Sequence, residues 1–166
     1  MRQSATATRW PSFRRSPGAE VSVELVAGPF DPWVRLAAWQ AARAGADSGA
    51  CAVFVGTMRD FNDGDSVRAM TLEHYPGMTE RALAGIADEA RTRWPVNALL
   101  IVHRVGPIGP GDAIVLTAAW SAHREAAFAA CRYLIEELKH RAPFWKKETL
   151  ADGGSRWVAR NTPAGG

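Results

Sequence analysis

Residues 98–120 read ALLIVHRVGPIGPGDAIVLTAAW, and this stretch decides the fold class. Two apolar runs, 98–105 and 114–120, flank a segment rich in proline and glycine. Apolar runs of this length between turn residues are typical of buried strands. Because the connection between them is short, the two strands are expected to lie antiparallel in one sheet.

One helix is predicted before this strand pair in the sequence and another after it. Ser121 directly follows the second apolar run and is expected to cap a long helix that reaches about Lys139. A second helix is expected to begin at Thr79, because apolar residues recur at helical spacing from there until Pro95 ends the pattern.

The N-terminal half predicts one more helix and a hairpin. Asp31 followed by Pro32 is a typical helix start, with the aspartate as N-cap and the proline in the first turn. Residues 50–57 and 67–74 are strand-like, and the segment between them is polar and contains turn residues. This pattern predicts a hairpin with a mobile loop.

The order of strands and helices predicts an α+β fold in which adjacent strands pair antiparallel. One domain is expected over residues 20–160, between a disordered basic tail at 1–19 and a short C-terminal tail at 161–166. Further short strands are predicted at 21–26, 144–150 and 156–158.

The composition excludes several classes of protein. The chain has 166 residues, 47% of them hydrophobic, and a net charge of +3. That charge permits an anionic partner but does not require nucleic acid, and no stretch is apolar enough for a membrane span. The two cysteines, Cys51 and Cys131, match no metal spacing, so we expect buried thiols, no metal and a cytoplasmic protein.

The segment Ser121-Ala122-His123-Arg124 is a candidate anion site. If Ser121 caps the helix, His123 and Arg124 lie in its first turn, where free N–H groups already favour negative charge. The alternative is that Glu125 or another carboxylate neutralises the two cations.

A second basic segment, residues 139–147, follows the end of the same helix. Lys139 at a helix C-terminus is favourable without any function. Lys146 differs, because it alternates with Trp145 in a predicted strand and one of the two must face inward. A lysine among apolar side chains has a lowered pKa and can take part in proton transfer.

Arg59 follows a predicted strand at the start of the polar loop and is a candidate phosphate ligand. Pairing with Asp60 or Asp63 is an equally supported reading. Glu73 and His74 are a weaker acid–base candidate, because such pairs are more often structural.

Taken together, these segments resemble the catalytic subunit of molybdopterin synthase, the MoaE family. The resemblance extends over residues 21–160, and the matching stretches occur in the family's order and spacing. They are Phe54-Val55-Gly56-Thr57-Met58-Arg59, the run from Leu72 to Glu80, Val102-His103-Arg104-Val105-Gly106, Ser121-Ala122-His123-Arg124, and the run from Arg141 to Glu148.

The resemblance implies an α/β-hammerhead-like domain with a small β-subdomain, and a sulfurtransferase that needs no cofactor. It also implies a homodimer within a heterotetramer, in which a small ubiquitin-like sulfur carrier presents a C-terminal Gly-Gly thiocarboxylate. The implied substrate is cyclic pyranopterin monophosphate, which receives the dithiolene sulfurs of molybdopterin.

By family position, Lys139 and Lys146 are the expected catalytic residues. One would assist the attack of the thiocarboxylate as a proton donor or acceptor, and the other would stabilise oxyanion charge. The expected substrate-binding residues are Thr57, Met58, Arg59, His123, Arg124, Lys147 and Glu148.

The spacing of these residues predicts a site shared between two chains. His123 and Lys139 are sixteen residues apart on one predicted helix, which separates them by roughly 24 Å. One small substrate cannot touch both in a single chain, so His123 and Arg124 are expected to complete the pocket of a second copy. Two alternatives to an enzyme are a binding module for a ubiquitin-like partner and a nucleic-acid-binding domain.

Overall fold

The computed structural model describes residues 18–43 and 46–158, which form two β-sheets and three helices. The predictions for residues 1–17 and 159–166, including most of both tails, lie outside the described residues. The elements are β1 (Glu20–Val26), α1 (Pro32–Ala42), β2 (Ala50–Thr57), β3 (Phe61–Asn62), β4 (Asp65–His74), α2 (Met78–Arg93), β5 (Val96–Arg104), β6 (Gly106–Ile108), β7 (Ala113–Ser121), α3 (Arg124–Arg141), β8 (Phe144–Leu150) and β9 (Ser155–Trp157).

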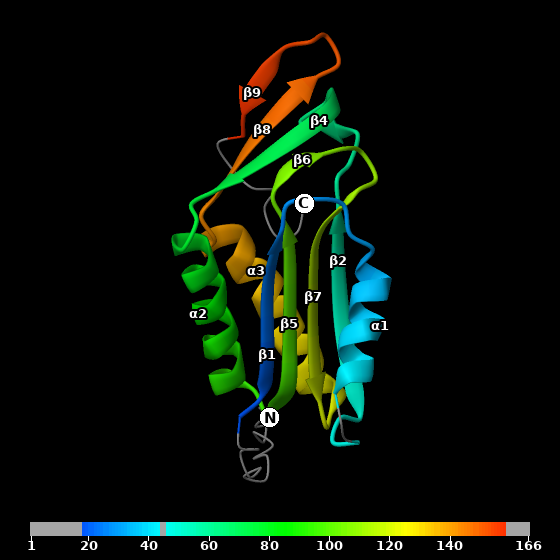
Figure 1. The fold of residues 1–166 in the computed structure, drawn as a ribbon, viewed down its shortest axis with the longest axis vertical. Coiled ribbons are helices and arrows are strands. Elements are labelled where there is room, and N and C mark those ends of the chain that lie inside the picture. Colours follow the sequence, from blue (N-terminus) through cyan, green and yellow to red (C-terminus); the bar gives the residue numbers. More distant parts are fainter. Residues whose placement is uncertain (1–17, 44–45, 159–166) are drawn as a thin grey trace, which may run out of the picture.

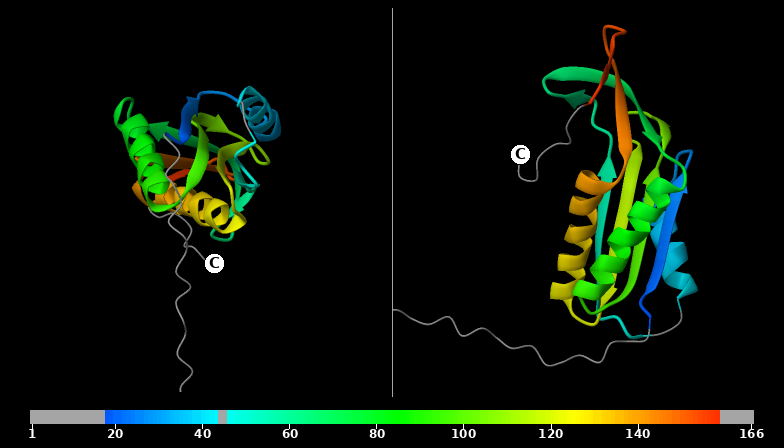
Figure 2. Two further views of the ribbon diagram at one scale, coloured as in Figure 1. Left: turned by 90° about the horizontal axis from the view of Figure 1, so that it is seen from below. Right: turned by 90° about the vertical axis from the view of Figure 1, so that its left-hand side faces the viewer.

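The first sheet has the strand order β1-β5-β7-β2 and is covered on both faces. β5 pairs antiparallel with β7, and β7 antiparallel with β2, whereas β1 joins β5 in parallel. Helices α2 and α3 lie on one face and α1 on the other (Figures 1 and 2). Because successive side chains point to opposite faces, β5 and β7 supply apolar residues to two separate cores.

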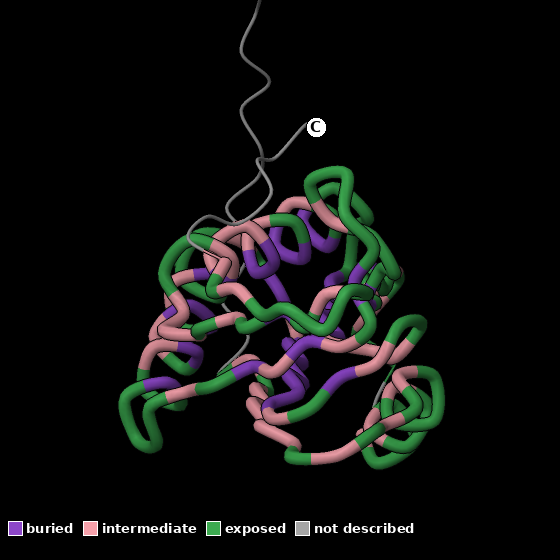
Figure 3. The backbone as a smooth tube through the Cα atoms, turned by 90° about the horizontal axis from the view of Figure 1, so that it is seen from above, coloured by how far each residue is buried: buried purple, intermediate pink, exposed green. Residues whose placement is uncertain are grey.

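The larger core lies beneath α2 and α3. It contains Leu99 and Ile101 of β5 together with Leu83 and Leu134 from the helices. The smaller core, under α1, contains Leu100 and the Trp120 ring. Figure 3 shows the buried segments gathered in the interior of the molecule. Because it is packed on both faces, the first sheet is a rigid support for the second sheet beyond its end.

The second sheet forms the small β-subdomain beyond one end of the first sheet (Figure 1). Its strand order is β3-β4-β8-β9. The short strand β6 pairs with residues 70–72 of β4, which also pair with β8. The predicted α+β class, with antiparallel strand pairs and a small β-subdomain, is confirmed.

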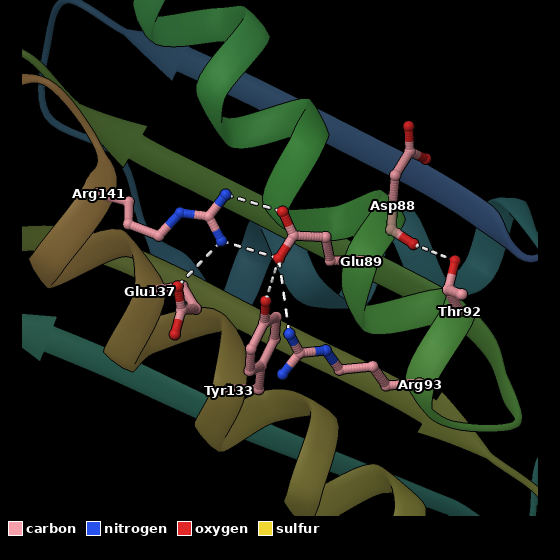
Figure 4. A network of polar contacts seen from close by, with 7 residues as sticks. All are labelled: Asp88, Glu89, Thr92, Arg93, Tyr133, Glu137 and Arg141. Carbon is pink, nitrogen blue, oxygen red and sulfur yellow. Dashed lines mark hydrogen bonds and ion pairs between the residues drawn. The ribbon is translucent and has the colours of Figure 1, made fainter.

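A polar network ties α2 to α3 on the surface (Figure 4). The Glu89 carboxylate accepts hydrogen bonds from the Arg141 guanidinium and the Tyr133 hydroxyl. Arg141 also pairs with Glu137, one turn earlier in its own helix. The bonds from Arg141 and then Tyr133 lower the pKa of Glu89 to about 2, so the network persists in mild acid.

The predicted hairpin between residues 50–57 and 67–74 is wrong. β2 pairs with β7 in the first sheet, whereas β4 lies in the second sheet. The register of β2 shifts between Gly56 and Thr57, and a bulge of this kind bends a strand and ends its pairing. The polar loop therefore carries the chain from one sheet to the other.

The predicted helix caps also differ from the structure. Ser121 is the last residue of β7, and its hydroxyl donates to the Pro95 carbonyl, so His123 is the N-cap of α3. Gly77 is the N-cap of α2, while the buried Thr79 hydroxyl accepts from the Tyr75 N–H. The Thr79 hydroxyl also donates to the Pro143 carbonyl, and Ser121 Oγ accepts the N–H of His123, which precedes the helix, so both hydroxyls bond to backbone groups outside the first helical turn.

The prediction of two buried thiols is half right. Cys131 is buried in the larger core, but Cys51 is exposed. The reason is the position of β2, which lies at the edge of the first sheet. The predicted N-cap Asp31 is confirmed, because its carboxylate accepts the N–H groups of Trp33 and Val34.

Candidate active site

A cavity of about 820 Å³ lies between the two sheets and the C-terminal end of α3. The ends of β2, β5 and β7 form one wall, and the inner face of the β-subdomain forms the opposite wall. Its lining brings together Thr57, Met58, Arg59, Lys139, Lys146 and Glu148 from the predicted site, and adds residues that include Phe61, His103 and Phe144.

Lys146 faces into the cavity because of the alternation along β8. Phe144, Lys146 and Glu148 line the cavity, whereas Trp145 between them is 47% exposed. Burial, followed by the nearby charge of Lys139, lowers the pKa of the Lys146 ammonium below its usual value of 10.5. The alternation predicted that either Trp145 or Lys146 faces inward. It is Lys146 that does so, with a lowered pKa, and its catalytic role stays a prediction.

Lys139 approaches the cavity from the last turn of α3. Two lysines from different elements thus line the same space, and the charge of Lys139 disfavours the charged form of Lys146. An anionic ligand between them relieves this repulsion. The arrangement therefore suits a substrate that carries negative charge.

Arg59 stands where the chain leaves the first sheet. Its guanidinium lies 5.0 Å from the centre of the Phe61 ring, and both residues line the cavity. Within the described segments no ion pair joins it to Asp60 or Asp63, and its role as a phosphate ligand stays a prediction.

Glu148 and Lys147 are placed differently from each other. Glu148 is only 5% exposed and accepts hydrogen bonds from the Asn62 amide and the Arg156 guanidinium. It therefore ties β3 and β9 to β8 while its carboxylate lines the cavity. Lys147 is exposed on the other face of β8, with its ammonium over the Trp157 ring, and the structure does not bring it to the cavity.

His123 and Arg124 lie at the N-terminal end of α3, opposite to Lys139. Neither residue lines the cavity of its own chain. This separation along the helix is what the spacing predicted, and the contribution of the two residues to a second copy stays a prediction.

His103 was not among the predicted site residues, yet it lines the cavity. Its ring is stacked on Phe144 with 4.0 Å between centres, and Nδ1 lies 2.9 Å from the Arg104 carbonyl oxygen. Because a carbonyl only accepts, Nδ1 carries the proton and Nε2 is an acceptor. The sequence offered one indication, since His103 shares the strand face of Leu99 and Ile101.

His103 is expected to make the protein sensitive to acid. Burial lowers its pKa from 6.5 to about 4. Between these two pH values His103 binds a proton in the unfolded chain but stays neutral in the folded chain. The free energy of unfolding should fall by about 3 kcal/mol from this group as the pH drops from 6.5 to 4. Urea unfolding of the wild type and His103→Gln at both pH values measures the difference, and an equal loss in both proteins contradicts the assignment.

Comparisons with known proteins show the family of this chain. The model of the family described as "MoaE protein" matches residues 29–141. The chain belongs to the MoaE family. Among curated MoaE relatives, the molybdopterin synthase catalytic subunit of Pseudomonas aeruginosa is 51% identical over 83% of this chain and 90% of its own length. That of Escherichia coli is 54% identical over 68% of this chain and 74% of its own.

Solved structures also resemble this MoaE chain. The molybdopterin biosynthesis MoaE protein of Burkholderia ambifaria is 48% identical, with a TM-score of 0.70 over 88% of this chain and 93% of that one. The molybdopterin synthase of Staphylococcus aureus is 35% identical, with a TM-score of 0.74 over 83% of this chain and 97% of that one.

The described residues lack two kinds of feature. No group of three or more histidine, cysteine or acidic side chains there could hold a metal ion. In the same residues, no helix is both long and apolar enough to cross a membrane.

Proposed function

We propose that this MoaE protein is the catalytic subunit of a molybdopterin synthase in the cytoplasm. It transfers sulfur from the thiocarboxylated C-terminus of a small carrier subunit to cyclic pyranopterin monophosphate and so builds the dithiolene of molybdopterin. The observation that carries the proposal is the cationic cavity, in which Lys146 with its lowered pKa faces Lys139, in a chain about half identical to catalytic subunits.

The two lysines suit the chemistry of each transfer. In each transfer the thiocarboxylate sulfur forms a bond to a substrate carbon while a carbon–oxygen bond of that carbon breaks, and the oxygen leaves on the phosphate of the opened ring or as water. Water then breaks the sulfur–acyl bond, which leaves the sulfur on the substrate and a carboxylate on the carrier. Lys139 lies beside the incoming thiocarboxylate and exchanges a proton, while Lys146 stabilises the oxyanion that develops at the acyl carbon. A buried ammonium does this better than an exposed one, because water screens it less.

The substrate's phosphate is held at the opposite wall. Arg59 offers a planar fork of N–H donors to phosphate oxygens, and the backbone of Thr57 and Met58 leads it to the cavity. Glu148 lines the same space but is engaged by Asn62 and Arg156, so it shapes the wall next to Lys146.

A carrier subunit is supported by one solved relative of the fold. The neighbour from Helicobacter pylori is titled as a protein–protein complex of subunits 1 and 2 of molybdopterin-converting factor, at 21% identity and a TM-score of 0.70. In the protein described here, the carrier's flexible Gly-Gly tail would enter the cavity between the sheets.

The pocket is completed by a second copy of this chain at the edge of β2. This edge strand exposes Cys51, Val53 and Phe54, and Phe128 on the neighbouring α3 is 66% exposed. Apolar side chains along an unpaired edge are typical of an interface. A two-fold axis beside the middle of β2 sets the two copies antiparallel.

The lengths of the two elements fit such a dimer. Ala50 at one end of β2 is paired with Ser121, next to His123, while Thr57 at the other end leads to Arg59. β2 spans roughly 23 Å, close to the roughly 24 Å that separates His123 from Lys139 along α3. Antiparallel copies therefore bring His123 and Arg124 of one chain to the cavity of the other.

Reconstitution tests the proposal. Purified protein is mixed with a thiocarboxylated carrier and cyclic pyranopterin monophosphate, and molybdopterin is detected as its fluorescent oxidation product. We expect product only with all three components. A folded protein that binds the carrier but yields no product would instead indicate a non-catalytic binding module.

A further inference from the structure

The ion pair between buried Arg104 and partly exposed Asp112 has no part in the chemistry above, although it closes the turn between β5 and β7. The Arg104 side chain is 6% exposed, and its Nη1 lies 2.9 Å from Asp112 Oδ2. Its Nη2 donates to the Pro107 carbonyl at 2.6 Å, and Asp112 Oδ2 also accepts the Gly109 N–H at 2.9 Å. One guanidinium therefore organises the whole turn.

The turn holds Met58 from both sides. The Met58 N–H donates to the Asp112 carbonyl at 2.9 Å, and the Met58 carbonyl accepts the Gly111 N–H at 2.8 Å. Met58 is itself buried, and the next residue is Arg59. The point at which the chain leaves the bulged end of β2 is thus fixed by the turn.

The same turn also reaches the strand that carries Lys146. Its first residues form β6, in which Gly106 pairs with Leu72 of β4. Leu72 pairs on its other side with Lys146 of β8. Gly106 and Lys146 are therefore the two neighbours of one β4 residue, so a shift of the turn is transmitted across β4.

We propose that Arg104 and Asp112 form a positioning clamp, which fixes Arg59 through Met58 and Lys146 through β6 and β4. The inference rests on the proposed function, because it assigns the clamp to the same site. Arg104 and Asp112 are positioning residues, since their contacts are with the turn that holds the site residues.

The energetics of the pair favour positioning over stability. The Asp112 side chain is 40% exposed, and an ion pair that water screens in part typically contributes little to stability. In the described part of the chain, the buried Nε of Arg104 also lacks a hydrogen-bond partner, and such a group is costly. What the pair does supply is a fixed geometry, because one planar group bonds both to Asp112 and to the Pro107 carbonyl.

Asp112→Asn tests the clamp, because the amide keeps an acceptor for Gly109 but loses the charge that holds Arg104. We expect the KM for the pterin substrate to rise about tenfold while kcat falls less than about threefold, since Met58 is bonded directly and Lys146 only through two strands. Amide exchange of Met58 and Gly111, followed by NMR, should become at least about tenfold faster. Arg104→Lys should have an intermediate effect, because it keeps the charge but not the fork.

Glu89→Gln is the matched control, since it weakens a surface ion-pair network between α2 and α3 far from the turn. It should lower Tm without changing KM or the exchange of Met58. An unchanged KM in folded Asp112→Asn overturns the clamp, whether or not exchange is faster; if that variant does not fold, the same outcome in Arg104→Lys overturns it. If the wild-type protein shows no turnover, that result counts against the proposed function and not against the clamp. Unchanged amide exchange of Met58 and Gly111 in Asp112→Asn would still refute the clamp.

Discussion

Lys146→Ala is expected to lose at least about a hundredfold in the rate of sulfur transfer, whereas Lys147→Ala stays within about twofold. The two lysines are neighbours in β8, but Lys146 faces the cavity and Lys147 lies over Trp157 on the other face. Single-turnover product formation measures both rates. Equal losses in the two variants would contradict the assignment of Lys146 to the chemistry.

The charge of Lys139 gives this prediction a pH dependence. Lys139 helps to lower the pKa of Lys146, so replacing Lys139 by glutamine removes a repelling charge and raises the pKa of Lys146. Arg59 and Asp63 of the loop, His103 of β5 and Glu148 of β8 line the same cavity and are unchanged by this substitution. In the plot of the variant's residual rate against pH, the midpoint that corresponds to deprotonation of Lys146 should therefore move to higher pH.

Mixed dimers are expected to recover activity that neither parent has. His123→Ala damages the pocket of the other chain, and Lys139→Ala damages its own, so each homodimer lacks both sites. A heterodimer of the two variants places both substitutions in one pocket and leaves the second intact, and should regain about half of the wild-type rate per dimer.

The mixed dimer must be verified by two affinity tags before its rate is measured. The matched control pairs His123→Ala with Arg124→Ala, because both residues would serve the partner's pocket and no intact site forms. Recovery in the first mixture and none in the second supports the shared site. No recovery in verified His123→Ala and Lys139→Ala heterodimers would refute it.

Much of the fold follows from local patterns in the sequence. The apolar runs at 98–105 and 114–120 are the central strands β5 and β7, because both faces of these strands are buried. Asp31 and Pro32 begin α1 as predicted, since capping depends on neighbouring residues alone. The alternation of Trp145 and Lys146 predicted that one of the two faces inward, and the structure shows that it is Lys146.

Contacts between residues far apart in the sequence could not be predicted from local patterns. β2 and β4 are joined by a polar loop that is typical of a hairpin, but the bulge at Gly56 and Thr57 separates them into two sheets. The carbonyls to which the hydroxyls of Ser121 and Thr79 donate are likewise remote in the sequence, at Pro95 and Pro143.

The residues of the candidate site likewise include some that local patterns predicted and some that depend on the three-dimensional fold. Arg59, Lys139 and Lys146 were predicted from local chemistry and family resemblance, and the fold brings them to one cavity. His103 and the clamp of Arg104 with Asp112 were missed, because their roles depend on burial and on a turn that folds around one guanidinium.

The most direct test of sulfur transfer uses a carrier whose thiocarboxylate contains a heavy sulfur isotope. The product formed by wild-type protein in a single turnover is analysed by mass spectrometry. The account predicts that both dithiolene sulfurs carry the isotope and that the spent carrier ends in a carboxylate. Product with unlabelled sulfur, or an intact thiocarboxylate after product has formed, would contradict it.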